Sequence, residues 1–158
     1  KEGSASVHLP DGAEGTIFET SRAYSGERTP LVVVAGKEYG TGSSRDWAAK
    51  GPLLLGIRAV LAESFERIHR SNLIGMGIVP LQFEEGQSAG SLGIAGREIF
   101  DIKLSGMSTR SKVRVVAYRD GEKLEFDTVS RVDVPAEMDY IRNGGILQTV
   151  LRNMVFPE

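Results

Sequence analysis

Two serines and an arginine stand side by side in the stretch Gly36–Gly51, which reads GKEYGTGSSRDWAAKG. Ser43 and Ser44 each carry a hydroxyl group, and Arg45 carries a planar guanidinium that matches the two oxygens of a carboxylate. Two glycines just before them allow the backbone to approach a ligand closely. This turn therefore predicts a site for a small polycarboxylate or a phosphate group.

The elements expected around the turn favour the same chemistry. Leu31–Ala35 is a short continuous apolar run, which is typical of a strand buried on both faces. Residues 43–46 match the Ser-x-x-acid capping pattern, which predicts a helix that runs to about Leu55. Because unpaired amides and the positive end of the helix dipole gather at such a start, an anion is favoured there.

The turn has two other interpretations. In the first, a serine only caps the helix and Arg45 is a solvated residue of the first helical turn. In the second, Gly40-x-Gly42 binds a dinucleotide, with Glu63 lying roughly 20 residues further along near the end of the next strand. Arg45 argues against the second interpretation, because it occupies the third glycine position of that fingerprint and its bulk would crowd a pyrophosphate.

The order of the elements predicts an α/β fold. Strands at Leu31–Ala35, Ile57–Ala62 and Gly77–Phe83 alternate with helices at 44–55 and Phe65–Ile74, which predicts a central parallel β-α-β-α-β part. Pro80 is expected at an edge or a bend, because proline cannot donate to a sheet.

The two ends of the chain differ from the central part in composition and in apolar patterning. Residues 1–30 are rich in Gly, Ser and Pro and predict at most one short helix, around Gly15–Tyr24. After Glu84 the pattern predicts antiparallel strands with Asp120-Gly121 as a hairpin turn, and then two C-terminal helices. These elements are Arg97–Leu104, Lys112–Tyr118, Lys123–Ser130, Pro135–Ile141 and Ile146–Met154.

Composition sets limits on the function. The chain has 158 residues, 41% of them hydrophobic and 25% charged, and a formal net charge of -2. We expect one cytoplasmic domain over residues 1–158 with no membrane partner, and no global basic field to attract nucleic acid. Since there is no cysteine and only two histidines, the chain is not expected to bind a metal or to supply thiolates to an iron–sulfur cluster.

Two long strings carry a family resemblance. Gly36–Gly51 and the run AESFERIHRSNLIGMGIVPLQF at residues 62–83 resemble the hallmark stretch of the C-terminal domain of aconitases of the bacterial and iron-regulatory-protein type. The later segments DIKL, SRVD and NGGILQTVLRNM are similar to the tail of that domain, so the resemblance covers nearly all of the chain. It implies the aconitase swivel-type domain, which closes over a substrate bound elsewhere in the enzyme.

The resemblance also implies a function. The family's enzymes are 4Fe-4S-dependent hydro-lyases that isomerise citrate and isocitrate through cis-aconitate, and 2-methylisocitrate dehydratases are among the relatives. By motif match, Ser43 takes the role of catalytic base, while Ser44 and Arg45 bind a substrate carboxylate. The family's cluster and remaining acid–base groups belong to other domains. We therefore expect those domains as partners, a tricarboxylate as substrate, and no activity from the isolated chain.

A second functional hypothesis is a non-catalytic module, namely an RNA-binding or interaction fragment of an iron-regulatory-type protein. Arg67, His69 and Arg70 would form its basic edge, although a solvated helix face is the simpler interpretation of these residues. His69 is expected to be a structural histidine of the second helix, and Trp47 a core residue. The family's domain also begins upstream with an Asn-x-Arg segment, which implies that this chain is truncated at its N-terminus.

Overall fold

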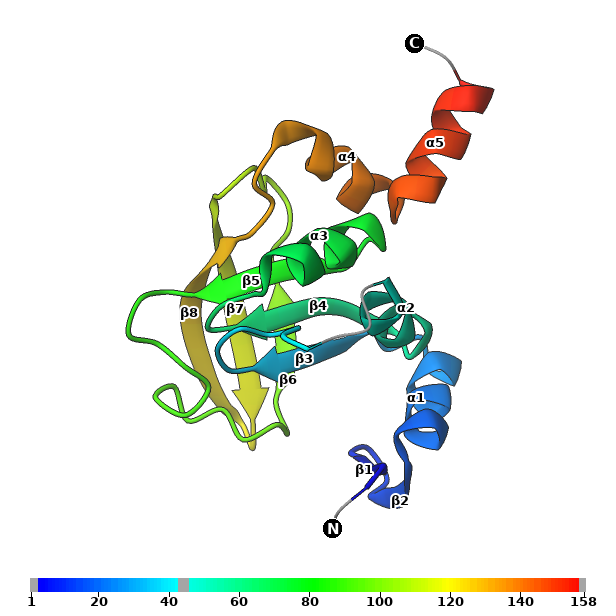
Figure 1. Cartoon of the computed structure of the whole chain (residues 1–158). Helices are drawn as coiled ribbons and strands as arrows, with labels where there is room; N and C mark the ends of the chain where they lie inside the picture. Colours follow the sequence, from blue (N-terminus) through cyan, green and yellow to red (C-terminus); the bar gives the residue numbers. More distant parts are fainter. Residues whose placement is uncertain (1–2, 43–45, 157–158) are drawn as a thin grey trace.

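A six-stranded mixed sheet forms the centre of the computed structural model, which describes residues 3–42 and 46–156 (Figure 1). Its strand order is β3-β4-β5-β8-β7-β6. The strands are β3 (Leu31–Ala35), β4 (Ile57–Ala62), β5 (Val79–Phe83), β6 (Ile99–Ile102), β7 (Lys112–Arg119) and β8 (Glu122–Ser130). The α/β class and the β-α-β-α-β order predicted from the sequence are confirmed.

Three parallel strands make up the first half of this sheet. β3 pairs with β4 and β4 pairs with β5, and the crossovers between them are α2 (Asp46–Leu54) and α3 (Arg67–Gly75). Both faces of β4 are covered: Ala59 and Leu61 belong to one apolar core, while Val60 and Ala62 belong to another that includes residues of α2 and α3. This double burial explains why β3 reads as a continuous apolar run and why β4 is apolar except at the exposed Arg58.

The second half of the sheet is antiparallel. β8 pairs with both β5 and β7, and β6 forms the outer edge. Asp120 and Gly121 join β7 to β8 with φ values of 51° and 82°, the positive values that a tight type I′ hairpin requires, so the predicted turn is confirmed. Of the two positions expected for Pro80, an edge or a bend, the edge is wrong, because β5 is a central strand. The Pro80 carbonyl accepts a hydrogen bond from Arg131 N–H, at 2.9 Å.

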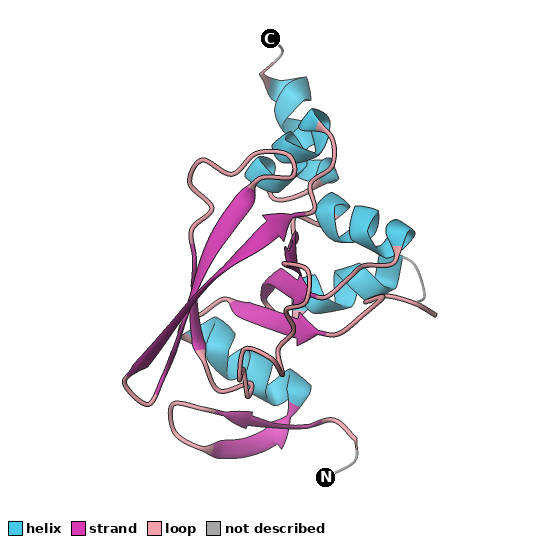
Figure 2. Ribbon diagram, turned by 90° about the vertical axis from the view of Figure 1, so that its left-hand side faces the viewer, coloured by secondary structure: helices cyan, strands magenta, loops and turns pink. Residues whose placement is uncertain are grey.

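The N-terminal segment is more regular than the sequence predicted. β1 (Ala5–His8) and β2 (Ala13–Thr16) form an antiparallel hairpin, and α1 (Ile17–Gly26) follows it directly. The single short helix expected around Gly15–Tyr24 is present as α1, but the hairpin before it was not predicted. Strands of four residues are too short for alternation to show in the sequence. The hairpin lies at one end of the molecule (Figure 2).

A buried ion pair ties α3 to α4 (Pro135–Asn143), the first of the two C-terminal helices. Arg70 is buried and donates two hydrogen bonds of 3.0 Å to the Glu137 carboxylate. Burial alone would raise the pKa of Glu137, but the bonds from Arg70 and from Asp133 N–H outweigh it and hold that pKa below its usual value. The interpretation of Arg70 as part of a solvated helix face is therefore wrong.

The last helix, α5 (Ile146–Val155), follows α4 after a break at Gly144 and Gly145, as the sequence predicted. Gly144 adopts a left-handed φ of 83°, which ends α4. No helix in residues 3–42 or 46–156 is both long and apolar enough to cross a membrane.

Candidate functional site

The loop that follows β3 lies along the loop that follows β4. Glu38 N–H donates to Ser64 Oγ at 2.7 Å, Tyr39 N–H donates to the Ser64 carbonyl at 2.9 Å, and Glu66 N–H donates to the Tyr39 carbonyl at 3.0 Å. Gly36 also accepts a hydrogen bond of 3.1 Å from Glu63 N–H. These bonds extend the parallel pairing of β3 and β4 past the ends of the strands. They hold the backbone that leads into the Gly-Ser-Ser-Arg turn.

Gly40 rests directly on the ring of His69. A Cβ atom at Gly40 would stand 2.2 Å from His69 Cγ and 2.3 Å from its Cδ2, which is too close for any side chain. Gly40 also has a φ of 100°, which L residues with side chains rarely adopt. By contrast, a Cβ at Gly42, with a φ of 76°, would meet nothing within 4 Å. The first glycine of the turn is thus required by contact and by conformation, and the second by conformation alone.

The side chain of His69 lies on the buried face of α3. It is 2% exposed, and the ring of Tyr39 approaches it edge-on with 5.0 Å between centroids. Burial lowers the pKa of His69, and the negative charge of Glu66 offsets that only in part. Glu66 caps α3 by accepting from Ile68 N–H at 3.0 Å and from His69 N–H at 2.8 Å. A neutral, buried histidine under the loop confirms the structural role predicted for His69.

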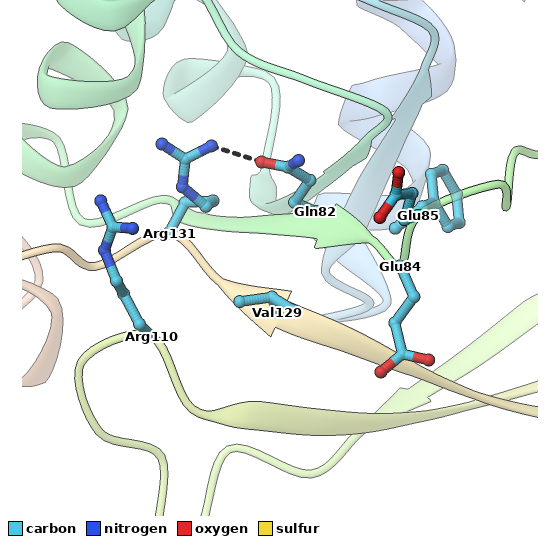
Figure 3. Close-up of a pocket in the computed structure, with 7 residues that line it drawn as sticks. Gln82, Glu84, Glu85, Arg110, Val129 and Arg131 are labelled. Carbon is cyan, nitrogen blue, oxygen red and sulfur yellow. Dashed lines mark hydrogen bonds between the residues drawn. The ribbon is translucent and has the colours of Figure 1, made fainter.

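Two hollows lie where β3, β4 and β5 end. One, of about 460 Å³, is bordered by Lys37 after β3, by Glu63 and Ser64 after β4, and by residues 82–87 at the end of β5. The other, of about 640 Å³, shares residues 82–85 with the first. Its remaining border is formed by Arg110, Val129 and Arg131 (Figure 3). Ligands of open α/β sheets bind at the carboxyl ends of the parallel strands, which is the edge where both hollows lie.

The larger hollow carries charges of both signs. Arg131 donates a hydrogen bond to Gln82 Oε1, and Arg110 Nε lies 3.1 Å from Asp133 Oδ1. At the other end, Glu84 pairs with Lys112 at 2.7 Å, and this contact raises the pKa of Lys112. Figure 3 shows the two arginines at one end of the hollow and Glu84 at the other. Cations lie at its β8 end, so any anionic group is favoured there rather than beside Glu84.

The predicted site residues Ser43, Ser44 and Arg45 lie outside the described residues. The described parts of the chain place both of their neighbours, Gly42 at the end of the held loop and Asp46 at the start of α2. The stretch thus belongs to the β3–α2 connection, the strand–loop–helix position that the sequence predicted.

Trp47 in the first turn of α2 is 65% exposed, so its prediction as a core residue is wrong. Its ring instead carries Lys50 Nζ 4.7 Å from the centroid. The physical reason is that only a narrow face of α2 packs against the sheet. Ala49 is the buried residue on that face, and Trp47 lies outside it.

Sequence reasoning missed most of the residues that border the hollows. Gln82, Arg110 and Arg131 come from segments far apart in the chain and match no local motif. A usable signal existed for Lys37 and Ser64, because each follows a predicted parallel strand, and such positions meet at one edge of the sheet. No comparable signal existed for the arginines, since the pairing of β5 with β8 brings Arg131 there and a hydrogen bond from Arg110 N–H to the Val132 carbonyl brings Arg110.

Fold and site together define an α/β domain with a ligand edge at the carboxyl ends of its parallel strands. The model of the family described as "Aconitase C-terminal domain" matches residues 1–86, which include the complete Gly36–Gly51 stretch. The chain belongs to this family. Glu63 directly follows β4, which is where the dinucleotide interpretation expected it.

Curated relatives agree with this assignment. The chain is 64% identical over 149 residues to aconitate hydratase A of Corynebacterium jeikeium, which covers 91% of the chain and 16% of the relative. It is 56% identical over 156 residues to aconitate hydratase A of Thermus thermophilus, which covers 98% of the chain and 17% of the relative. The chain therefore spans about a sixth of the length of the relatives it matches.

A solved structure shares the fold. The crystal structure of 3-isopropylmalate dehydratase from Methanocaldococcus jannaschii matches with a TM-score of 0.61 at 21% identity, covering 89% of this chain and 80% of that one. At this identity the match concerns the architecture alone. It supports the predicted swivel-type fold.

Gly40→Ala is expected to lower the free energy of unfolding by about 1–3 kcal/mol more than Gly42→Ala does. Both changes force alanine into a left-handed conformation, but only the first also drives a methyl group into the His69 ring. Urea unfolding of the two variants and the parent chain measures the difference. Equal losses would show that Gly40 does not pack on His69.

Proposed function

We propose that this chain is the part of an aconitate hydratase-type hydro-lyase that supplies the serine base and a substrate-carboxylate clamp. The substrate class is a tricarboxylate, and the reaction isomerises citrate and isocitrate through cis-aconitate. The observation that supports the proposal is the Gly-Ser-Ser-Arg sequence within the family match, between β3 and α2. The aconitate hydratase A relatives support the same activity.

Elementary chemistry is consistent with these roles. Removing a proton from the carbon next to a carboxylate builds negative charge on that carboxylate. Stabilisation by Arg45 and by the start of α2 is then greatest in the transition state. A positive environment also favours the alkoxide of Ser43, which as a free hydroxyl is too weak a base at neutral pH. Ser44 adds a hydroxyl donor to the same carboxylate.

The iron–sulfur cluster that such an enzyme uses does not fit this chain. The sequence contains no cysteine, and the described residues contain no group of three or more His, Asp or Glu side chains that could hold a metal ion. In the proposed enzyme, other domains therefore bind the cluster. This chain contributes the base and the carboxylate clamp, and its partner is the remaining polypeptide or subunit.

RNA binding is the weaker alternative. Of the three residues that formed the expected basic edge, Arg70 is buried against Glu137 and His69 is buried under Gly40. Only Arg67 of this cluster lies on the surface. A single exposed cation does not make a basic patch, so the cluster gives no support to a nucleic-acid partner.

The isolated 158-residue chain is expected not to hydrate cis-aconitate, even after reconstitution with iron and sulfide, because it has no thiolate for the cluster. The complete polypeptide that carries it should do so under the same conditions. Loss of cis-aconitate absorbance measures both. Turnover by the isolated chain would refute the dependence on other domains, and an inactive, cluster-loaded complete polypeptide would refute the proposed function.

Ser43→Ala in the complete enzyme is expected to lower kcat by about 10²- to 10⁴-fold while KM changes little, because a lost base acts on the chemical step. Ser25→Ala, a change at an exposed serine of α1, serves as the matched control and should leave both constants unaltered. Steady-state kinetics at equal cluster content make the comparison. A drop below about tenfold would remove Ser43 from the role of base.

Arg45→Lys distinguishes a carboxylate clamp from a solvated helix residue. Lysine keeps the charge but cannot form two parallel N–H bonds to one carboxylate, so kcat/KM should fall roughly ten- to a hundredfold. The control is Arg142→Lys, at an exposed arginine of α4 whose Nη1 lies 3.3 Å from Asp139 Oδ1, and it should be silent. Unchanged kcat/KM in a stable, cluster-loaded Arg45→Lys enzyme would leave Arg45 without a role in binding.

A further inference from the structure

The apolar face of α5 points away from its own domain. Leu147, Val150, Leu151 and Met154 recur at the spacing of one helical face, and we call them the α5 stripe. Their exposed fractions range from 49% for Val150 to 74% for Met154. In Figure 1, α5 extends beyond α3 and α4 into solvent. In a surface helix the apolar face normally turns toward the core, so α5 has the reverse orientation.

Polar contacts hold α5 in this orientation. Thr149 is the buried residue of the helix, and its hydroxyl lies 2.9 Å from the Gly145 carbonyl and accepts a bond of 3.2 Å from Asn143 Nδ2. At the start of α5, Gly145 N–H donates to the Tyr140 carbonyl at 2.7 Å. The polar groups on the side of α5 that faces the domain thus form hydrogen bonds. None of the four stripe residues belongs to either apolar core of the described chain.

The close packing of α5 against α3 connects the stripe to the candidate site. A Cβ at Gly145 would stand 3.0 Å from the carbonyl oxygen of Gly75, the last residue of α3. The same helix carries His69, on which the loop at Gly40 rests. A partner that holds α5 therefore also holds, through one rigid helix, the backbone that leads to the Gly-Ser-Ser-Arg turn.

The dimensions of the stripe argue against a second copy as its partner. The four side chains of the stripe are about half to three-quarters exposed, which leaves on the order of 450 Å² of apolar surface. A stable dimer needs about 800 Å² from each partner. Within one polypeptide a small contact is sufficient, because the effective concentration of the tethered partner reaches the millimolar range.

The relatives indicate where that polypeptide comes from. The alignment to the Thermus thermophilus protein covers 98% of this chain, which leaves out too few residues to omit α5, yet it spans only 17% of that protein. The helix therefore lies in the stretch that this chain shares with an enzyme about six times longer. Most of such an enzyme is available to cover the stripe.

We propose that the α5 stripe docks on an apolar surface of the polypeptide outside these 158 residues. The contact positions this domain, through α5 and α3, within the longer enzyme. The inference rests on the proposed function in one respect only, which is that this chain works inside a longer enzyme. Docking itself requires no particular substrate.

Labelling of a single engineered thiol tests the docking, because the chain has no cysteine of its own. Met154→Cys and the control Ile99→Cys replace side chains that are both 74% exposed, the second on edge strand β6. In the isolated chain the two thiols should react with a maleimide at similar rates. In the complete polypeptide, Met154→Cys should react at least about tenfold more slowly, whereas Ile99→Cys should be unchanged. Mass spectrometry of the labelled peptide separates these thiols from cysteines elsewhere.

A second variant confirms the cause of the protection. Adding Leu151→Gln to Met154→Cys in the complete polypeptide should restore fast labelling, because it weakens the apolar contact. Equal rates for Met154→Cys and Ile99→Cys in the complete polypeptide would overturn the proposal. So would protection of Met154→Cys in the isolated chain at rising protein concentration or on adding phosphatidylcholine vesicles, which would mean a second copy or a membrane.

The hydratase assay distinguishes a failure of the docking proposal from a failure of the proposed function. Protection of Met154→Cys in a cluster-loaded polypeptide without hydratase activity would support docking and refute the function. Full activity with an unprotected thiol would support the function and refute docking.

Discussion

The contact between the Gly40 backbone and the His69 ring is the constraint on which the candidate site depends. It joins the loop after β3 to the first turn of α3, and only a residue without a side chain permits it. The hydrogen bonds from Glu38 and Tyr39 to Ser64 then align the same loop with the one after β4. The backbone that leads toward the Gly-Ser-Ser-Arg sequence is thus held on two sides, which is the preorganisation that the proposed carboxylate clamp needs.

From α3 the same rigidity extends to the C-terminal part of the fold. Arg70, one residue after His69, is neutralised by Glu137 at the start of α4 and also donates to the Arg131 carbonyl at 2.8 Å. A buried arginine is tolerated only when its charge and its N–H groups are satisfied, so α4 and the end of β8 have little freedom to move relative to α3. The domain therefore offers one relatively rigid body that carries both the ligand edge and the outward-facing α5 stripe.

Much of this arrangement could be predicted from local patterns. The apolar run of β3, the glycines before the turn and the Asp120-Gly121 hairpin can each be explained from a few neighbouring residues. The role of Ser43, in contrast, was not inferred from a local pattern. It came from the resemblance to a family and stays a proposal. The β1–β2 hairpin was missed, because four-residue strands leave no readable period in the sequence.

What the sequence determined by itself was the order of strands and helices, the family, and the position of the Gly-Ser-Ser-Arg turn between a parallel strand and a helix. Only the tertiary structure decided that Arg70 is buried, that Trp47 is exposed, and that Arg131 reaches the hollow beside Gln82. It also decided that the apolar face of α5 points outward. The reason is that periodicity shows which face of an element is apolar. What that face or a single charge meets depends on segments distant in the chain, and these come together only when the sheet forms.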